Sequence, residues 1–247
     1  MKNILLILSV LLLVSCNSDN APDCFQNAGD IIQKEVTVEA FTKITVFKNV
    51  ELIITQGPIQ RVVLETGEYL LSDVEVKVEN GRLLLKDNNG CNLTREYGVT
   101  KVYVTSPNLT EIRNSTNLTV RSNGVLNYET LDLLSEDYNE DFYNVGIFDL
   151  EVNSNNLKVT FNNLSTIFIS GIVTNLNIGF FSGDGRFEGR NLIADKVTIY
   201  HRGTNDIIVN PQESITANLV STGDVIVVNT PPMVTVTEQF NGRVIFE

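Results

Sequence analysis

A short motif of alternating residues recurs in the carboxy-terminal part of the chain, and this repeat restricts the folds available to it. Its five copies begin at Leu157, Leu176, Val197, Ile215 and Val234, at steps of 19, 21, 18 and 19 residues. A turn sequence and a second short apolar stretch follow each copy. A period near twenty residues with two strands per period is typical of solenoid proteins.

The alternation separates an apolar face from a polar face. Successive side chains of a strand point to opposite faces. The first, third and fifth positions of each copy are mostly apolar, whereas the positions between them are mostly polar, as at Lys158 and Asn177. A single copy cannot bury its apolar face, but copies stacked about 4.8 Å apart can. We therefore predict an all-β fold of parallel β-helix or β-solenoid-like stacked rungs.

The predicted stack places the first residues of the five copies in one interior column, and Phe161, Phe180, His201, Leu219 and Glu238 in another. The turns support this register because Gly183-Asp184, Asn205-Asp206 and Gly223-Asp224 fall at equivalent corners. Gly and Asn accept a positive φ, and Asp can bond its own backbone in a tight corner. An antiparallel sandwich also fits short strands at such spacing and remains the alternative.

The chain divides into four expected segments. Residues 1–15 form a signal peptide, 16–34 a tether, 35–98 a more irregular N-terminal β lobe, and 99–247 the β-solenoid lobe. Lys2 supplies the positive start of the signal peptide, and residues 4–12 form an apolar run too short to span a bilayer.

A cysteine ends the predicted signal segment. The sequence Leu13-Val14-Ser15-Cys16 resembles the lipobox of bacterial lipoproteins. The resemblance implies cleavage before Cys16, lipidation of that residue, and anchoring to a membrane through acyl chains. An ordinary signal peptide with an unrelated cysteine is the alternative. Position 17 is Asn rather than Asp, which favours the outer membrane and leaves the periplasmic or surface face open.

Two further cysteines, Cys24 and Cys91, remain. An even pair in an oxidising compartment predicts a disulfide, which would tie the tether to the first lobe; two unpaired thiols are the alternative. No cluster of metal-ligand type accompanies the pair, so no zinc site is expected.

Charge and chemistry exclude several function classes. The net charge of −12 argues against nucleic-acid binding. The corner residues Asp184, Asp206 and Asp224 could share a Ca²⁺ ion, although bonds to turn amides are the simpler interpretation. The sole histidine, His201, lies in a core-facing column and is interpreted as structural. We expect no cofactor, no metal and no catalysis.

Residues 135–143 interrupt the rung spacing with acidic and aromatic side chains. Exposed aromatic residues on a loop are suited to sugar or protein contacts. Tyr138, Phe142 and Tyr143 are therefore the candidate binding residues. The alternative is a solvated bulge whose rings cover the next rung.

Most of the chain after the tether resembles the head GIN domain family of auto-transporter adhesins. The residues that carry the resemblance are Ala21–Cys24, Gly29–Ile31, Phe41–Ile44, Val50–Gly57, Asn89–Asn92, Ser221–Val225, Pro231–Val234 and Gly242–Phe246. The resemblance implies that residues 35–247 together form one adhesin-like domain of stacked rungs. It brings no catalytic residues.

We thus expect a non-catalytic envelope lipoprotein with an adhesin-like binding role. Its membrane contact would be the lipid anchor, and its partner a glycan or an envelope protein. An architectural envelope protein is an alternative, and a carbohydrate-active β-helix enzyme is a second one, although no Trp is present and the rung register marks no pair of carboxylates. The sequence leaves the oligomeric state open.

Overall fold

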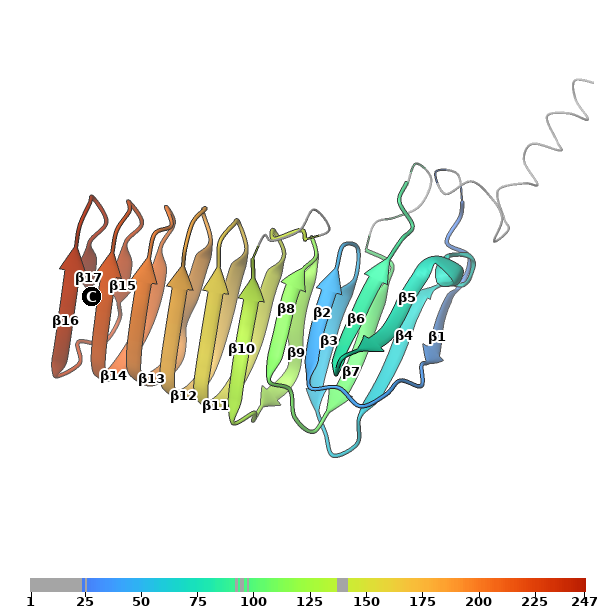
Figure 1. Ribbon diagram of the computed structural model, residues 1–247, viewed down its shortest axis with the longest axis horizontal. Coiled ribbons are helices and arrows are strands. Elements are labelled where there is room, and N and C mark those ends of the chain that lie inside the picture. Colours follow the sequence, from blue (N-terminus) through green and yellow to red (C-terminus); the bar gives the residue numbers. More distant parts are fainter. Residues whose placement is uncertain (1–23, 25, 92, 94–95, 97, 137–141) are drawn as a thin grey trace, which may run out of the picture.

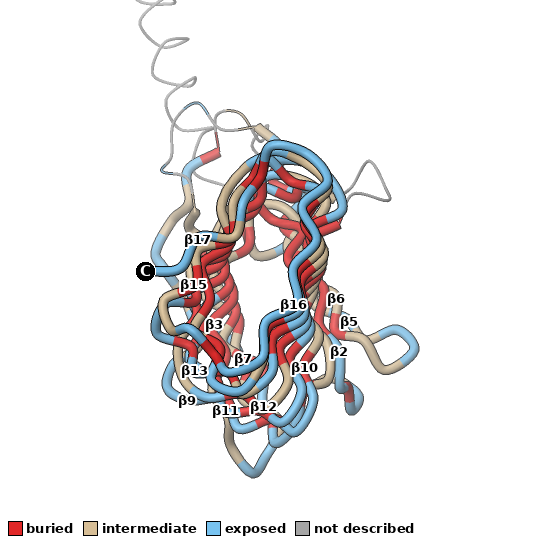
Figure 2. The backbone as a smooth tube through the Cα atoms, turned by 90° about the vertical axis from the view of Figure 1, so that its left-hand side faces the viewer, coloured by how far each residue is buried: buried red, intermediate tan, exposed pale blue. Residues whose placement is uncertain are grey.

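The computed structural model describes residues 24, 26–91, 93, 96, 98–136 and 142–247. Its strands form one 17-stranded sheet that folds into two facing walls along the long axis of the molecule (Figure 1). Seen along that axis, the buried residues line the inner sides of both walls (Figure 2). The prediction of an all-β fold is confirmed.

The regular elements are β1 (Ile31–Glu35), β2 (Lys43–Phe47), β3 (Glu51–Gln56), β4 (Arg61–Gly67), the 3-10 helix η2 (Glu68–Asp73), β5 (Val74–Glu79), β6 (Arg82–Asp87), β7 (Lys101–Ser106), β8 (Glu111–Ser115), β9 (Thr119–Leu126), β10 (Thr130–Ser135), β11 (Ile147–Phe161), β12 (Thr166–Phe180), β13 (Arg186–His201), β14 (Ile207–Leu219), β15 (Val225–Val227), β16 (Met233–Glu238) and β17 (Val244–Phe246).

Strands β11 to β14 each pass through both walls. The first part of β14 pairs in parallel with β15, and its second part pairs in parallel with β16. Likewise, the first part of β11 pairs with β9 and the second part with β10. We call the wall that contains β3, β7, β9, β15 and β17 wall A, and the wall that contains β2, β6, β8, β10 and β16 wall B.

The register of these parallel pairs follows the sequence repeat. Leu157 lies beside Leu176, Leu176 beside Val197, Val197 beside Ile215, and Ile215 beside Val234. The predicted interior column is therefore confirmed. Each β-branched or Leu side chain from Leu157 to Ile215 covers the next one and is removed from water, whereas Val234 in the last strand of the column remains 44% exposed.

The two corners of each period differ. Four- to five-residue turns join wall B to wall A, as the sequence predicts, for example between β12 and β13. At the opposite corner the chain makes no separate turn, because β11 to β14 bend while their ladders continue. Residue Gly171 lies in this bend of β12 with a φ of 115°, a conformation that a glycine adopts without steric cost.

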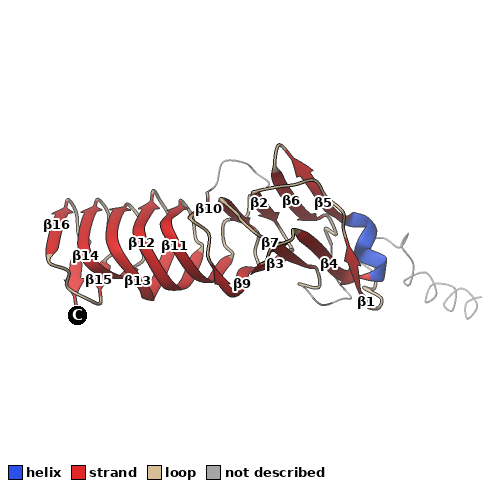
Figure 3. Cartoon of the chain, turned by 90° about the horizontal axis from the view of Figure 1, so that it is seen from below, coloured by secondary structure: helices blue, strands red, loops and turns tan. Residues whose placement is uncertain are grey.

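The amino-terminal strands join the stack out of chain order. On wall B, β2 lies between β6 and β8; on wall A, β3 lies between β7 and β9. All of these pairs are parallel. Strands on either side of residue 98 thus pair directly with one another. Antiparallel pairs of β1 with β4, β4 with β7, and β5 with β6 complete this end, beside η2 (Figure 3).

One continuous apolar core runs between the walls, from Phe41 to Val227. Near the turns, the rings of Phe148, Phe161 and Phe180 stack in sequence, with centroids 6.0 and 5.2 Å apart. Such offset ring pairs add stabilisation beyond the area that they bury.

Candidate binding surfaces

The predicted disulfide is present. Cys24 and Cys91 are bonded, and they close a loop with a sequence separation of 67 residues. The bond joins the start of the described chain to the segment after β6. The lipidation candidate Cys16 lies outside the described residues. Among the described residues, no helix has the length and apolar character needed to cross a membrane.

The candidate binding residues of the loop before β11 (residues 135–143) lie in different environments. Tyr138 lies outside the described residues. The Phe142 ring packs against Phe47 of β2 at a centroid distance of 5.9 Å, and the Arg113 guanidinium lies 5.3 Å from its centre. Tyr143 is 45% exposed, with the Lys48 ammonium 6.0 Å from its ring. Phe142 therefore covers the neighbouring rung, whereas Tyr143 faces solvent.

The corner turns stack through their backbones. The amide of Asp184 donates to Asn163 O, Thr204 to Gly183 O, and Gly242 to Ser221 O, at 2.9 to 3.0 Å. This close approach explains the glycines, since a Cβ at Gly183 would lie 2.4 Å from Asn163 O.

The corner aspartates bond to different groups. The hydroxyl of Thr204 donates to Asp184 at 2.6 Å, the Arg186 guanidinium pairs with Asp206 at 3.0 Å, and the backbone N–H of Arg243 donates to Asp224 at 2.8 Å. Within the described part of the chain, no three metal-ligating side chains of the His, Cys, Asp or Glu type gather in one place.

His201 lies in the predicted core-facing column, between Phe180 and Leu219. The backbone N–H of Gly203 donates to Nδ1 at 3.3 Å, which leaves the ring proton on Nε2, where it is donated to Asn205 O at 2.8 Å. Burial lowers the pKa of His201, against the opposing effects of the Asn205 carbonyl and of Asp206 and Asp224. The neutral imidazole is hydrogen-bonded through both nitrogens to the turn between β13 and β14, so we interpret His201 as a structural residue.

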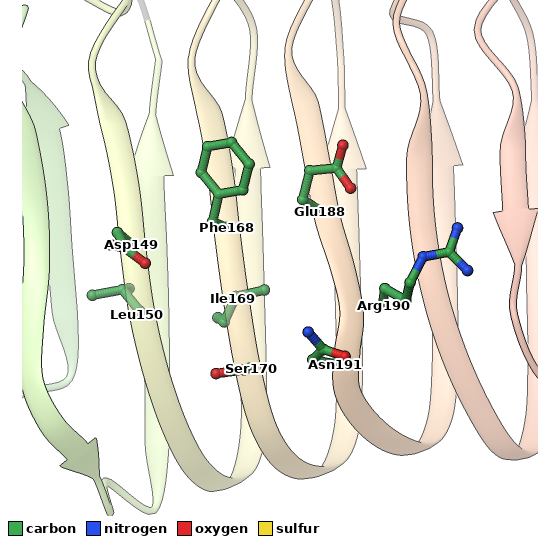
Figure 4. A pocket seen from close by; sticks show the side chains of 8 residues that line it. All are labelled: Asp149, Leu150, Phe168, Ile169, Ser170, Glu188, Arg190 and Asn191. Atoms are coloured by element: carbon green, nitrogen blue, oxygen red, sulfur yellow. The ribbon is translucent and has the colours of Figure 1, made fainter.

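An open groove lies on the outer surface of wall A (Figure 4). We call it the wall A groove; it has a volume of about 360 Å³. Its lining comes from β11, β12 and β13, namely Asp149, Leu150, Phe168, Ile169, Ser170, Glu188, Arg190 and Asn191. Parallel pairing places Asp149, Phe168 and Glu188 side by side, because their strands are in register.

The wall A groove combines an exposed ring with polar groups. Phe168 is 47% exposed although it lies between two carboxylates. Glu188 accepts from the Arg186 guanidinium at 2.6 Å, and Arg190 pairs with Glu247 at 2.5 Å. Among the described residues, the side chains of Asp149 and Asn191 make no hydrogen bond or ion pair to another protein group. The groove thus offers an aromatic face beside unengaged hydrogen-bonding groups.

This groove is not predicted from the sequence, because the second short apolar stretch after each repeat copy indicates only a core strand. The signal was present in the alternation: with Ile167 and Ile169 facing inward, Phe168 has to face solvent.

The sequence profile described as "Putative auto-transporter adhesin, head GIN domain" matches residues 40–231. The chain belongs to this family. The match includes both walls and the wall A groove. No curated protein matches the sequence.

Several crystal structures are similar to this head GIN domain chain. A putative adhesin from Bacteroides fragilis shares 21% identity and a TM-score of 0.78, over 88% of this chain and 97% of that one. A putative lipid binding protein from Parabacteroides distasonis shares 17% identity and a TM-score of 0.60, over the same shares. A putative adhesin from Parabacteroides merdae shares 14% identity and a TM-score of 0.55, also over 88% and 97%. At these identities the likeness establishes the fold alone.

Proposed function

We propose that this protein is a lipid-anchored envelope protein that binds a glycan or another envelope protein without altering it chemically, in an adhesin-like role. The observation that carries the proposal is the wall A groove, where an exposed Phe168 ring lies beside unengaged polar groups. Large apolar groups on a rigid, solvent-facing wall are typical of binding surfaces. Family membership and similarity to proteins named as adhesins support the same role.

In this proposal, residues 35–247 form one β-solenoid domain. Its support is the parallel register of the repeat copies and the continuous core. A stack of this kind holds outward side chains at fixed spacing, which suits recognition of an extended partner.

The anchor of the proposal is Cys16. The Leu13-Val14-Ser15-Cys16 sequence supports lipidation and placement in the outer membrane, on its periplasmic or surface face. With Cys16→Ser, we expect the protein to lose fatty-acid labelling and to leave the membrane fraction, whereas Ser18→Ala behaves as wild type. Equal labelling of both variants would contradict the anchor. Protease treatment of intact cells then distinguishes the two faces.

The contact residues of the proposal are Phe168 and Asp149 in the wall A groove, together with the loop residues Tyr138, Phe142 and Tyr143. In the loop, the exposed Tyr143 is best placed for contact, because Phe142 is engaged with Phe47 and Arg113.

Binding of the lipid-free chain to glycan arrays, envelope extracts and whole cells tests the role. We expect Phe168→Ala with Asp149→Asn, or Tyr143→Ala, to reduce retention. Phe240→Ala is the matched control, since Phe240 is also an exposed ring (59%) but lies at the carboxy-terminal turn. No retention of the wild-type chain on any of these surfaces would favour the architectural alternative.

A carbohydrate-active enzyme is the second candidate, because Asp149 and Glu188 flank the Phe168 ring. Glycoside hydrolysis requires one carboxylic acid that keeps its proton, whereas Glu188 is ion-paired with Arg186. Release of reducing sugar from a bound glycan, lost in Glu188→Gln, would favour the enzyme over the adhesin-like role.

A further inference from the structure

A second groove lies on the outer surface of wall B, on the opposite side of the molecule from the wall A groove. We call it the wall B groove; its volume is about 360 Å³. It crosses the second parts of β11, β12, β13 and β14, which run side by side beyond β10 in Figure 1. The residues that matter here are Thr160, Asn177, Phe181, Thr198, Tyr200 and Thr216.

Two aromatic rings form a platform in this groove. The Phe181 and Tyr200 rings lie 5.4 Å apart with an angle of 30° between their planes. Phe181 is 47% exposed, although Phe180, the residue directly before it, is fully buried. Gly179 permits this position, because a Cβ there would lie 2.7 Å from the Phe181 ring. The other rungs of the same outward row carry larger residues, Thr160, Tyr200 and Asn218.

A row of polar side chains runs beside the platform. Asn177, Thr198 and Thr216 are neighbours in register on three successive strands, and all are exposed. Within the described residues, their side chains and the Tyr200 hydroxyl make no hydrogen bond to another protein group. The row therefore presents one unengaged donor or acceptor at each rung, about 4.8 Å from the next.

A buried hydroxyl at the groove adds an independent observation. Thr160 is only 6% exposed, and its Oγ1 has no hydrogen-bond partner in the described structure. An unsatisfied buried polar group carries a free-energy cost, so a local rearrangement that brings a ligand hydroxyl to this Oγ1 would be favoured by the new hydrogen bond. Thr160 pairs in register with Gly179, and Gly179 is two residues before Phe181 in the sequence.

We propose that the wall B groove is a saccharide-binding site for neutral or N-acetylated sugars. The apolar C–H face of one sugar ring would stack on Phe181 and Tyr200, since aromatic faces carry partial negative charge. Hydroxyl or acetamido groups of that sugar and the next would bond with Asn177, Thr198 and Thr216. The lining contains no carboxylate and a single cation, Lys158, while the chain as a whole carries a net charge of −12, which disfavours anionic glycans.

This inference rests on the proposed function and gives it a ligand class. The experiment uses the lipid-free chain, defined oligosaccharides of galactose, mannose and N-acetylglucosamine, and a sialylated glycan for comparison. Affinity is measured by calorimetry and saturation-transfer NMR. We expect Phe181→Ala to weaken binding of a neutral saccharide about tenfold or more, equivalent to about 1.4 kcal/mol.

A second variant keeps both rings and changes only their placement. Gly179→Ala displaces the Phe181 ring and is expected to weaken binding several-fold, while Phe240→Ala, a change of an exposed ring outside both grooves, leaves the affinity unchanged. Circular dichroism and thermal unfolding verify that each variant is folded, and Asn177→Ala serves as an additional probe if Gly179→Ala does not fold.

The outcomes separate this inference from the proposed function. Loss of saccharide binding with Phe181→Ala, but not with Phe240→Ala, supports both. Saccharide binding that Phe168→Ala abolishes and Phe181→Ala preserves overturns the wall B site and keeps the function. Retention on an envelope protein with no affinity for any of these glycans, or preference for the sialylated glycan, also overturns it. Absence of all binding overturns both.

Discussion

At the scale of single residues, the space beside each glycine decides how closely neighbouring rungs approach. Gly171 and Gly124 both have positive φ values, 115° and 88°. A Cβ at Gly171 would lie 1.9 Å from Val152 O, whereas a Cβ at Gly124 would meet nothing within 4 Å. The two positions therefore share a backbone preference and differ in packing.

We predict that Gly171→Ala destabilises the protein by about 3 kcal/mol or more, because the backbone of β11 has to move as well. Gly124→Ala is the matched control and should cost only about 1 kcal/mol for its left-handed conformation. Urea unfolding measures both. Equal losses would show that the contact with Val152 has no influence on stability.

The environment of His201 leads to a pH-dependence. Burial lowers its folded-state pKa, whereas the unfolded value is about 6.5. Between these two values the unfolded chain binds more protons, so stability is retained above about pH 6.5 and falls as pH decreases toward the folded-state pKa. We expect His201→Gln to show a flatter decline in unfolding free energy over this window, and the single imidazole to titrate below 6.5 by NMR.

Carboxylates titrate in the wild type and in this variant alike, so their contribution cancels in the comparison. Parallel pH profiles for the two proteins would mean that the protonation of His201 is not coupled to folding.

At the scale of elements, adjacent aromatic residues at the end of β12 have opposite environments. Phe180 is fully buried between Phe161 and His201, with the His201 ring edge-on at 5.8 Å. Phe181 follows directly and lies on the outer surface of wall B. Alternation along the chain thus places the Phe180 ring in the core and the Phe181 ring in the wall B groove.

Phe180→Ala is expected to reduce the free energy of unfolding by about 3–5 kcal/mol, through lost burial and the cavity that remains. Phe181→Ala should change it by less than about 1 kcal/mol, since surface substitutions outside special features have small effects. Thermal and urea unfolding provide the comparison. A large loss with Phe181→Ala would mean that this ring stabilises the rung rather than serving a ligand.

The Cys24–Cys91 disulfide also acts at the scale of elements, because it links the start of the described chain to the segment after β6. Cys24→Ser, Cys91→Ser and the double variant should each lose roughly 4 kcal/mol, as expected for closing a loop of 67 residues. The three losses should be equal, because one substitution already breaks the bond. A larger loss in the double variant would indicate that the single thiols form other contacts.

At the scale of the whole molecule, the sequence predicts the all-β fold and the register of the repeat copies well, and the order of the amino-terminal strands poorly. The columns through Leu176 and Phe180 follow from alternation and period, because these depend on local spacing. The continuous bend in β11 to β14 does not, since polar residues such as Ser154 and Asn155 resemble a loop in composition. The insertion of β2 and β3 between later strands depends on pairing between distant segments, which no local pattern records.

The candidate sites show the same division. The cysteine pair and the position of His201 follow from counting and register. The two grooves depend on outward residues from three or four separate strands, and only the superposition of rungs brings Phe168 and Glu188, or Phe181 and Tyr200, together.

Stability should vary along the stack. Strand β12 has a partner on each side, whereas β16 pairs with β14 and β17 with β15 among the described residues. Because a rung is stabilised mainly by its neighbours, we expect amide hydrogen exchange to be faster in β16 and β17 than in β12. Uniform protection throughout would indicate that the whole stack opens in a single cooperative step.

The passage of β11 to β14 through both walls has a consequence for how such proteins diversify. Duplication or deletion of one segment of about twenty residues adds or removes one strand in each wall at the same time. The molecule then grows or shrinks by about 4.8 Å, its interior columns gain or lose one member each, and both outer faces are extended equally. The length of the molecule is therefore adjustable in whole steps, independently of which side chains either outer face carries.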